Sequence, residues 1–365
     1  MLILPGDVYA CRQPDPVLQQ IEMTHDMSIS TNDAFRPVCR YWDRIVRPEQ
    51  LMSAMLSAFR VLTDPANTGA VCIAMPQDVE GEAYDYPETF FKKRVWRLER
   101  RPATEIALED AAAAIKKAKR PMLICGGGVV RGRAHEQFRV FAERMDAPVA
   151  ITLMGGGGFP GDHTLTTGMI GMHGSKASNV AANKCDLLIA VGCRFSDRVA
   201  LNPTTFASQA KIVQIDVDRA EIDKNVATDH HIIGSARRVL SMLNEKLPQY
   251  EHQEWKDYIL PMRTPSAAGD EEYLTPQQVL DVINQRAPKG SMVSTDVGQH
   301  QMWAVQYCRH VKPRKFLTSG GLGTMGYGYG AAIGARIGVE AERPVVHFTG
   351  DGSFHMNMNE ACTAV

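Results

Sequence analysis

The chain has 365 residues, of which 44% are hydrophobic and 22% charged, and its formal net charge is −1 at pH 7. That length favours two or three domains, and the near balance of acids and bases argues against a dedicated nucleic-acid surface. No apolar stretch approaches the roughly 20 residues that a membrane-spanning helix needs, and the first residues lack the layout of a signal peptide. We therefore expect a cytoplasmic enzyme without membrane association. Its eight scattered cysteines include no C-x-x-C pair, so reduced thiols are expected rather than disulfides or a zinc site.

Residues 1–78 form the first expected piece. Arg47-Pro48-Glu49 precedes an apolar stripe at helical spacing, and a β-branched run at 70–74 predicts a strand. The stripe consists of Leu51, Met55, Ala58, Phe59 and Leu62. Residues 79–104 are charged, aromatic and punctuated by prolines, as expected of a linker.

Residues 105–250 form the second piece. An alanine-rich helix is expected from about 106 to 119, followed by strands at 121–125, 186–191 and 211–217 that alternate with helices. This alternation predicts a doubly wound α/β domain. His230 and His231 are adjacent, so on a strand their side chains point to opposite faces, and we expect no metal there. A second polar linker is expected at 251–270.

Residues 271–365 form the third piece. Thr275 before Pro276 predicts a helix start, with the helix running from 277 to 285. The apolar run 344–349 predicts a buried strand that ends at Gly350-Asp351-Gly352-Ser353. Glycines there let backbone N–H groups approach a phosphate, while the carboxylate suits a hard cation. Helical spacing of apolar residues from Phe354 to Val365 predicts one helix to the end of the chain.

Two further motifs accompany this strand end: Val297-Gly298-Gln299-His300-Gln301-Met302-Trp303 and Leu317-Thr318-Ser319-Gly320-Gly321-Leu322-Gly323-Thr324-Met325-Gly326. In this order the three motifs resemble the thiamin-diphosphate enzymes, and residues 122–365 are most similar to acetolactate synthase. The resemblance implies an α/β fold with a partial pyrimidine-binding domain, a doubly wound central domain and a partial diphosphate-binding domain. It also implies that Gln299 and His300 bind the diphosphate, that Met325 supports the thiazolium, and that Asp351 binds Mg²⁺. The full set of implied thiamin-diphosphate contacts is Val297, Gly298, Gln299, His300, Gly323, Met325, Gly350, Asp351, Gly352 and Ser353.

The same resemblance implies FAD in the central domain. Glycine turns after apolar strands suit a dinucleotide, because each turn offers donors to the pyrophosphate and an arginine adds positive charge. The implied contacts are Gly127, Gly128, Thr152, Leu153, Met154, Met172, His173, Gly174, Gly192, Arg194, Arg198 and Asp216. Arg198 with Asp197 also has an alternative interpretation as a surface ion pair.

Residues 2–120 resemble a second thiamin-diphosphate enzyme, trihydroxycyclohexanedione hydrolase, which opens a ring by hydrolysing a C–C bond. The similar segments include Leu4-Pro5-Gly6-Asp7-Val8, Arg12-Gln13-Pro14-Asp15-Pro16 and Tyr41-Trp42-Asp43-Arg44. A changeover between the two resemblances is expected near residues 120–130, where both families carry a similar strand and glycine turn.

The resemblance of residues 122–365 favours acetolactate synthesis from pyruvate and a second 2-keto acid. It also implies a homodimer or higher oligomer, with a possible regulatory small subunit. The hydrolase of inositol breakdown is one alternative, and a non-catalytic cofactor-binding fragment is another. Relative to the family both ends are expected to be truncated, and the family's catalytic glutamate lies outside this chain. We therefore assign no catalytic residue.

Overall fold

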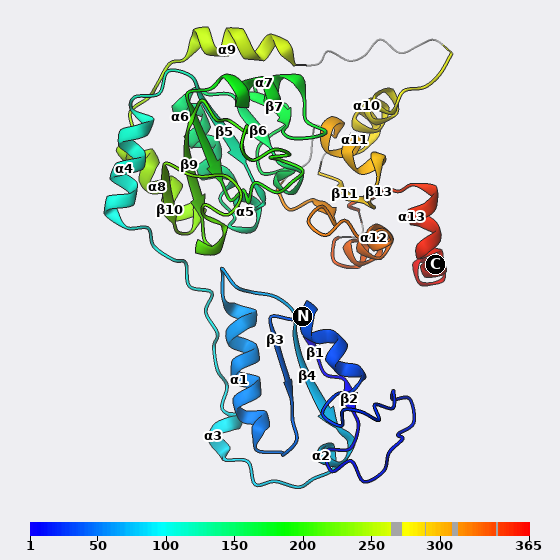
Figure 1. The fold of residues 1–365 in the computed structure, drawn as a ribbon. Helices are drawn as coiled ribbons and strands as arrows, with labels where there is room; N and C mark the ends of the chain where they lie inside the picture. Colours follow the sequence, from blue (N-terminus) through cyan, green and yellow to red (C-terminus); the bar gives the residue numbers. More distant parts are fainter. Residues whose placement is uncertain (264–271, 289, 309–312, 341) are drawn as a thin grey trace. The chain divides into compact units, whose positions relative to one another are not determined.

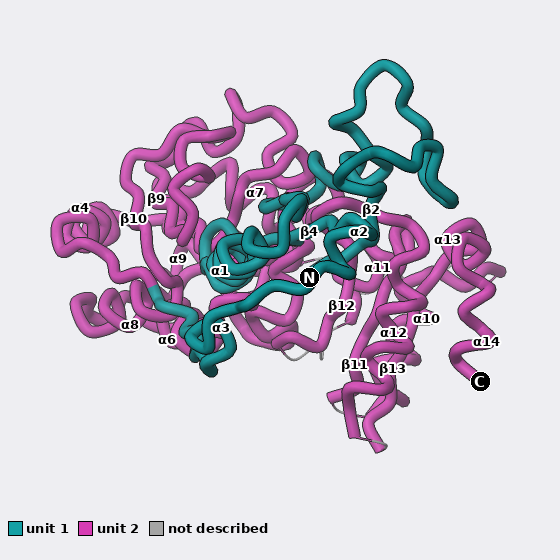
Figure 2. The backbone as a smooth tube through the Cα atoms, turned by 90° about the horizontal axis from the view of Figure 1, so that it is seen from below, with its two compact units in different colours: residues 1–100 teal, residues 101–365 magenta. Residues whose placement is uncertain are grey.

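The computed structural model describes residues 1–263, 272–288, 290–308, 313–340 and 342–365 (Figure 1). The chain divides into two compact units, residues 1–100 and 101–365, which Figure 2 distinguishes by colour. All the strand pairs in the described residues are parallel, in both units. The α/β fold class predicted from the sequence is confirmed.

Unit 1 is built around strand β4 (Val71–Pro76), which pairs with β1 (Leu2–Ile3), β2 (Gly6–Asp7) and β3 (Tyr41–Arg44). Helix α1 (Gln50–Thr63) packs Ala54 and Ala58 against this sheet, with Met55 and Leu62 partly buried beside them; of these residues only Ala54 lies outside the predicted stripe. The remaining helices are short: η1 (Thr31–Val38), α2 (Gln77–Glu80) and α3 (Glu88–Phe91).

The core of unit 2 is a six-stranded sheet in the order β10-β9-β8-β5-β6-β7. Its strands are β5 (Pro121–Cys125), β6 (Val149–Ile151), β7 (Thr166–Met169), β8 (Leu187–Val191), β9 (Lys211–Asp216) and β10 (His230–Ile233). The central strands β5 and β8 are buried along their whole length. Near-continuous apolar runs of this kind are typical of a parallel sheet that is covered on both faces.

Helices cover both faces of this sheet (Figure 1). Because side chains alternate along a strand, Leu123 packs with α4 (Glu105–Ile115), α6 (His135–Met145) and α8 (Ala236–Lys246), whereas Ile124 packs with α7 (Lys176–Lys184) and α9 (Gln253–Ile259). Helix α5 (Gly127–Arg131) and the turns η2 (Leu153–Gly155), η3 (Arg219–Glu221) and η4 (Leu260–Met262) complete this part.

The carboxyl-terminal part of unit 2 has a three-stranded sheet, β12-β11-β13, formed by Phe316–Thr318, Met292–Thr295 and Val345–Phe348. Its helices are α10 (Pro276–Arg286), α11 (Gln299–Tyr307), α12 (Tyr327–Ile337), α13 (Asp351–Met356) and α14 (Ala361–Ala364), with turn η5 (Met358–Glu360). Thr275 caps α10 by accepting a hydrogen bond from the Gln278 N–H, as predicted. The single helix expected after Phe354 is instead interrupted at Asn357, where the backbone is not helical and the side chain donates to the Gly326 carbonyl.

The interval expected to be a second linker, residues 251–270, is largely structured where it is described. Helix α9 buries Trp255 and Ile259 in the core, and the Trp255 indole N–H donates to the Pro121 carbonyl. Residues 264–270 of that interval lie outside the described residues. The boundary between the two units falls at Arg100, inside the first expected linker.

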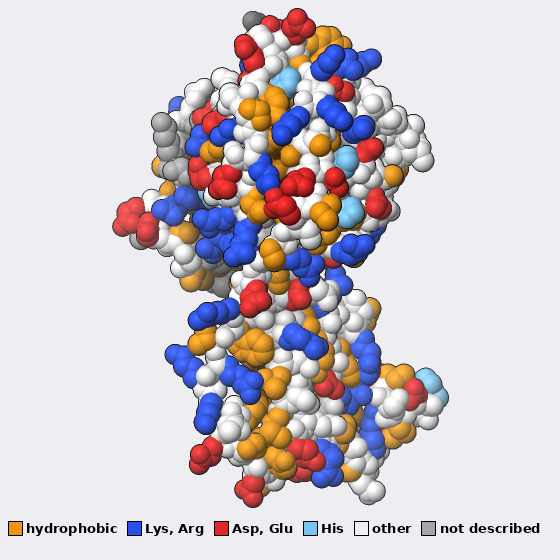
Figure 3. Space-filling model, turned by 90° about the vertical axis from the view of Figure 1, so that its left-hand side faces the viewer, with side chains coloured by type: hydrophobic (Ala, Val, Ile, Leu, Met, Phe, Trp, Pro, Cys, Tyr) orange, Lys and Arg blue, Asp and Glu red, His pale blue; other side chains and the backbone are white. Residues whose placement is uncertain are grey.

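Within the part of the chain that the structure describes, no helix is long and apolar enough to span a bilayer. Figure 3 shows acidic and basic side chains interspersed over the face that it presents.

Candidate functional site

The central sheet has a switch point between β5 and β8. Strands β5, β6 and β7 progress in one direction from this point, and β8, β9 and β10 progress in the other. The turns after the two central strands touch there: the Gly128 N–H donates to the Gly192 carbonyl at 3.0 Å, and a Cβ on Gly192, whose φ is +60°, would lie 2.3 Å from the Gly128 Cα. Open α/β sheets bind ligands outside the carboxyl ends of their strands at such a point.

A cavity of about 600 Å³ opens at this edge of the sheet. Arg131, Arg194 and Arg198 line it, with Asp197 as the acidic counterpart, so its charge is net positive. The Arg198 guanidinium pairs with Asp197 at 2.7 Å, and both side chains are largely exposed. A cationic cavity beside glycine turns is chemically suited to a diphosphate.

Most of the residues expected to contact FAD line this cavity: Gly127, Thr152, Leu153, Met154, Met172, His173, Gly192, Arg194 and Arg198. Gly128, Gly174 and Asp216 are not among its lining residues. Asp216 ends β9, where burial raises the pKa of its carboxyl, although the backbone N–H groups of Asp218 and Val217 favour its ionised form. Arg131 was missed from the sequence because it lies at the far end of α5, beyond the glycines that the resemblance singled out.

The diphosphate motifs converge at the carboxyl ends of β11, β12 and β13. Asp296, which the sequence analysis did not single out, is fully buried at the end of β11. Its carboxylate accepts hydrogen bonds from the N–H groups of Val297 at 2.9 Å, Gly326 at 2.8 Å and Gly328 at 3.2 Å. These bonds anchor the first turn of α12 to the turn that begins α11.

The strand end at Gly350 lies against the same turn. The buried Ser353 hydroxyl donates to the Val297 carbonyl at 3.0 Å, and a Cβ on Gly350 would lie 3.3 Å from the His300 Nδ1. His300 Nε2 is buried without a hydrogen-bond partner among the described residues. Burial lowers the pKa of the His300 imidazole, which outweighs the opposing effect of Asp296. An unsatisfied buried ring nitrogen beside two glycine turns fits a site that receives a diphosphate.

Met325 and Asp351 complete the predicted set. A Cβ on Gly352 would lie 3.6 Å from the Met325 Cε, so these two motifs meet, while Gly323 adopts a φ of +75° that favours glycine. Gln299 and Asp351 are exposed, each at the start of a helix. Among the described residues no three His, Cys, Asp or Glu side chains converge on a metal site. Asp351 could thus contribute one oxygen ligand to Mg²⁺, with diphosphate and water providing others.

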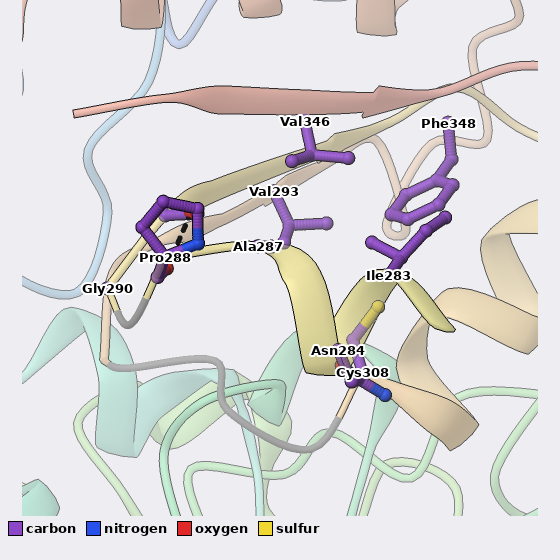
Figure 4. Close-up of a pocket in the computed structure, with 10 residues that line it drawn as sticks. Ile283, Asn284, Ala287, Pro288, Gly290, Val293, Cys308, Val346 and Phe348 are labelled. Carbon is purple, nitrogen blue, oxygen red and sulfur yellow. Dashed lines mark hydrogen bonds between the residues drawn. The ribbon is translucent and has the colours of Figure 1, made fainter. Parts of the chain in front are cut away.

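A separate, small apolar pocket of about 40 Å³ lies between α10 and strands β11 and β13 (Figure 4). Ile283, Val293, Val346 and Phe348 line it, and burial raises the pKa of the neighbouring Cys308 thiol to about 12. An apolar space of this size beside a protonated thiol is a packing gap rather than a catalytic site.

Two family models match the chain. Residues 108–243 match the central domain of thiamine pyrophosphate enzymes, and residues 296–365 match the C-terminal TPP-binding domain of the same enzymes. The chain belongs to the thiamine pyrophosphate enzyme family. The second match contains all of the residues predicted to contact thiamin diphosphate, whose individual roles remain predictions.

Among curated proteins, the chain is 38% identical over 403 aligned residues to 3D-(3,5/4)-trihydroxycyclohexane-1,2-dione hydrolase of Bacillus anthracis, and 39% identical over 407 to the enzyme of that name in Clostridium perfringens. Each match covers 100% of this chain, which spans 62% of the length of these relatives.

The expectation of an acetolactate-synthase-type carboligase acting on 2-keto acids is therefore wrong. The motifs behind it, at 297–303, 317–326 and 350–353, are those predicted to bind the cofactor, and a cofactor motif does not identify the substrate. The relatives that match the full length of the chain are named as hydrolases, and the match extends on both sides of residues 120–130.

Proposed function

We propose that this chain is part of a thiamin-diphosphate-dependent hydrolase that cleaves a C–C bond in a polyhydroxylated cyclic 1,2-dione. The full-length similarity to hydrolases of 3D-(3,5/4)-trihydroxycyclohexane-1,2-dione carries the choice of substrate class. The convergence of Val297, His300 and Ser353 at one sheet edge supports the use of the cofactor.

The residues of this chain would hold and orient the cofactor. Asp351 presents a carboxylate for the magnesium ion that accompanies a diphosphate, and the unpartnered His300 Nε2 is available for a hydrogen bond to a phosphate oxygen. Met325, which meets Gly352, provides apolar support for the thiazolium ring. When bound, thiamin diphosphate supplies a carbanion and an electron sink for the bond that breaks. Asp296 acts indirectly, because its hydrogen bonds fix the backbone of both neighbouring turns.

The experiment is to incubate the full chain with thiamin diphosphate, Mg²⁺ and the trihydroxycyclohexane dione, and to follow the ring-opened acid by NMR. We expect cofactor-dependent product, with pyruvate unchanged in a parallel reaction, only where the family's catalytic glutamate, which the resemblance places outside this chain, is also supplied. The matched variant is Asp351→Asn, with Asp110→Asn on the exposed face of α4 as control. Cofactor binding without turnover would instead support the alternative of a non-catalytic cofactor-binding chain.

We also propose that the 600 Å³ cavity binds a dinucleotide such as FAD. Its position at the switch point and its three arginines support a diphosphate-linked ligand. A flavin absorbance spectrum in the purified protein, or saturable binding of added FAD, is the expected result. Colourless protein that does not bind FAD would contradict the assignment.

A homodimer or higher oligomer is proposed on the basis of exposed apolar side chains around the cofactor turns. Leu322 is 89% exposed, and Met325, Met356 and Met358 are 42–55% exposed. Surface of this kind is typical of an interface, and sedimentation of the full chain as a monomer would contradict it.

We further propose a cytoplasmic location, supported by eight free cysteines, four of them buried; cell fractionation tests it.

A further inference from the structure

Two turns that carry predicted thiamin-diphosphate contacts also line the 600 Å³ cavity, which is called the nucleotide cavity below. Val297, Gly298, Gln301 and Met302, at the start of α11, line it, and so does the turn 319–323. Three of these residues, Val297, Gly298 and Gly323, belong to the set predicted to contact thiamin diphosphate. The same short segments therefore face both candidate ligands.

Close packing joins these turns to the nucleotide-binding turns. A Cβ on Gly320 would lie 2.6 Å from the Leu153 Cδ2 and 2.8 Å from the Met154 Sδ, so the turn rests directly on the turn after β6. The Gln306 side chain of α11 donates a hydrogen bond to the carbonyl of His173, another cavity residue. Each of these two cavity segments therefore contacts either α11 or the turn 319–323.

The turn 319–323 is also tied to α11, whose first turn carries His300. The buried Gln301 side chain donates to the Thr318 hydroxyl at 2.6 Å. Beyond Gly320 the turn is exposed, and two of its hydrogen bonds are internal, from the N–H groups of Gly323 and Thr324 to Ser319. A ligand that packs against this turn would therefore restrain its exposed part, from 321 to 323.

We propose that the turn Ser319–Gly323 couples the two sites, so that a dinucleotide in the cavity and thiamin diphosphate with Mg²⁺ bind more tightly together than separately. The proposal rests on the proposed function of the two sites. The first ligand to bind orders the shared turn, so the second ligand meets a smaller entropy cost. Because linkage is reciprocal, each ligand raises the affinity of the other by the same factor, expected to be on the order of 10-fold.

The test is calorimetric titration of the full chain with thiamin diphosphate at fixed Mg²⁺, with and without saturating FAD, and the reverse titration. We expect the Kd of each ligand to fall by the same factor when the other is present. Both ligands binding with unchanged Kd values would overturn the coupling and leave the proposed function intact. Thiamin diphosphate binding without FAD binding would overturn the coupling and the cavity assignment, whereas failure of thiamin diphosphate to bind would remove the proposed function itself.

Gly320→Ala is the decisive variant, because its methyl group must displace Leu153 or Met154. We expect the coupling factor to fall toward 1. The matched control is Gly334→Ala in α12, where a Cβ meets nothing within 4 Å, and it should retain the full factor. Gln306→Ala removes the contact to His173 without adding bulk, and it should lower the coupling even if Gly320→Ala fails to fold. Full coupling in both variants would contradict the proposal.

Discussion

The two sheets of unit 2 differ in how completely they are covered. In the six-stranded sheet the two central strands, β5 and β8, are buried at every residue. In the three-stranded sheet the central strand β11 is buried at three of its four residues, and the outer strands β12 and β13 are only partly buried throughout. The cavity proposed to bind a nucleotide thus lies at the edge of a sheet with a fully buried centre, while the turns predicted to bind thiamin diphosphate follow strands with less covering. The comparison predicts that stability and thiamin-diphosphate binding are carried by different parts of this unit.

Truncation of a core aromatic should show the largest effect. Phe138 on α6 is fully buried, so Phe138→Ala should cost about 3–5 kcal/mol of unfolding free energy. The same substitution at Phe354, which is 36% exposed and contacts Tyr329, should cost about 1 kcal/mol. Chemical denaturation of both variants measures the difference, and equal losses would break the comparison.

Gly192→Ala should disable the nucleotide cavity. The added Cβ would lie 2.3 Å from the Gly128 Cα, in a left-handed conformation that disfavours alanine. We expect about 1–3 kcal/mol of destabilisation and a clear loss of FAD affinity. Gly330→Ala, in open space on α12, is the control and should leave both quantities nearly unchanged. Retained FAD affinity in Gly192→Ala would show that the contact at the switch point is not needed.

Asp296→Asn should weaken thiamin diphosphate binding with little change in the central sheet. The amide loses the charge that three backbone N–H groups share, and hydrogen bonds to a charged group contribute about 1.5–3 kcal/mol. We therefore expect a loss of affinity on the order of 10-fold or more. Calorimetry measures this loss. Unchanged affinity for thiamin diphosphate together with lost FAD binding would show that Asp296 supports the nucleotide cavity and not the thiamin-diphosphate site.

The smallest effect is expected in unit 1, where Arg44 binds Asp7 at 2.7 Å and also pairs with Asp33. Burial disfavours the Asp33 carboxylate, but hydrogen bonds from the Ser30 N–H and from Arg36 and Arg44 outweigh it and lower its pKa. A lowered pKa stabilises the fold above the unfolded value of 3.8, and that stability is lost as pH falls through the folded value. Asp33→Asn should therefore cost about 1 kcal/mol or less at pH 7 and a smaller amount at pH 3, which lies below the unfolded value of 3.8. Urea unfolding at both pH values tests this, and an equal cost at both would contradict it.

Strands and capped helices were readable from the sequence because their signals are local. The β-branched runs gave β5, β8, β9 and β13 within two residues at each end, and Thr275-Pro276 marked the start of α10. Helix α9 was read as linker because its core contacts, mainly Trp255 and Ile259, are too few to form a clear periodic stripe. The break at Asn357 was missed because it depends on a bond to the distant Gly326.

For the site, the motif residues could be proposed from the sequence, whereas the residues that support them could not. Val297, Gly350 and Ser353 share one strand-end pattern that physical chemistry links to phosphate. In the sequence, Asp296 cannot be distinguished from other acidic residues at strand ends. Its partners Gly326 and Gly328 lie 30 and 32 residues further along the chain, and only the fold brings them to it. The reaction expected from residues 122–365 was wrong because cofactor motifs do not specify the substrate.

Calorimetric titration of the full chain with thiamin diphosphate in the presence of Mg²⁺ tests the central claim most directly. We expect saturable binding to one site per chain, weakened in Asp351→Asn and unaffected in Asp110→Asn. No binding by the folded protein, or equal binding by all three proteins, would contradict the cofactor site described at the carboxyl ends of β11, β12 and β13.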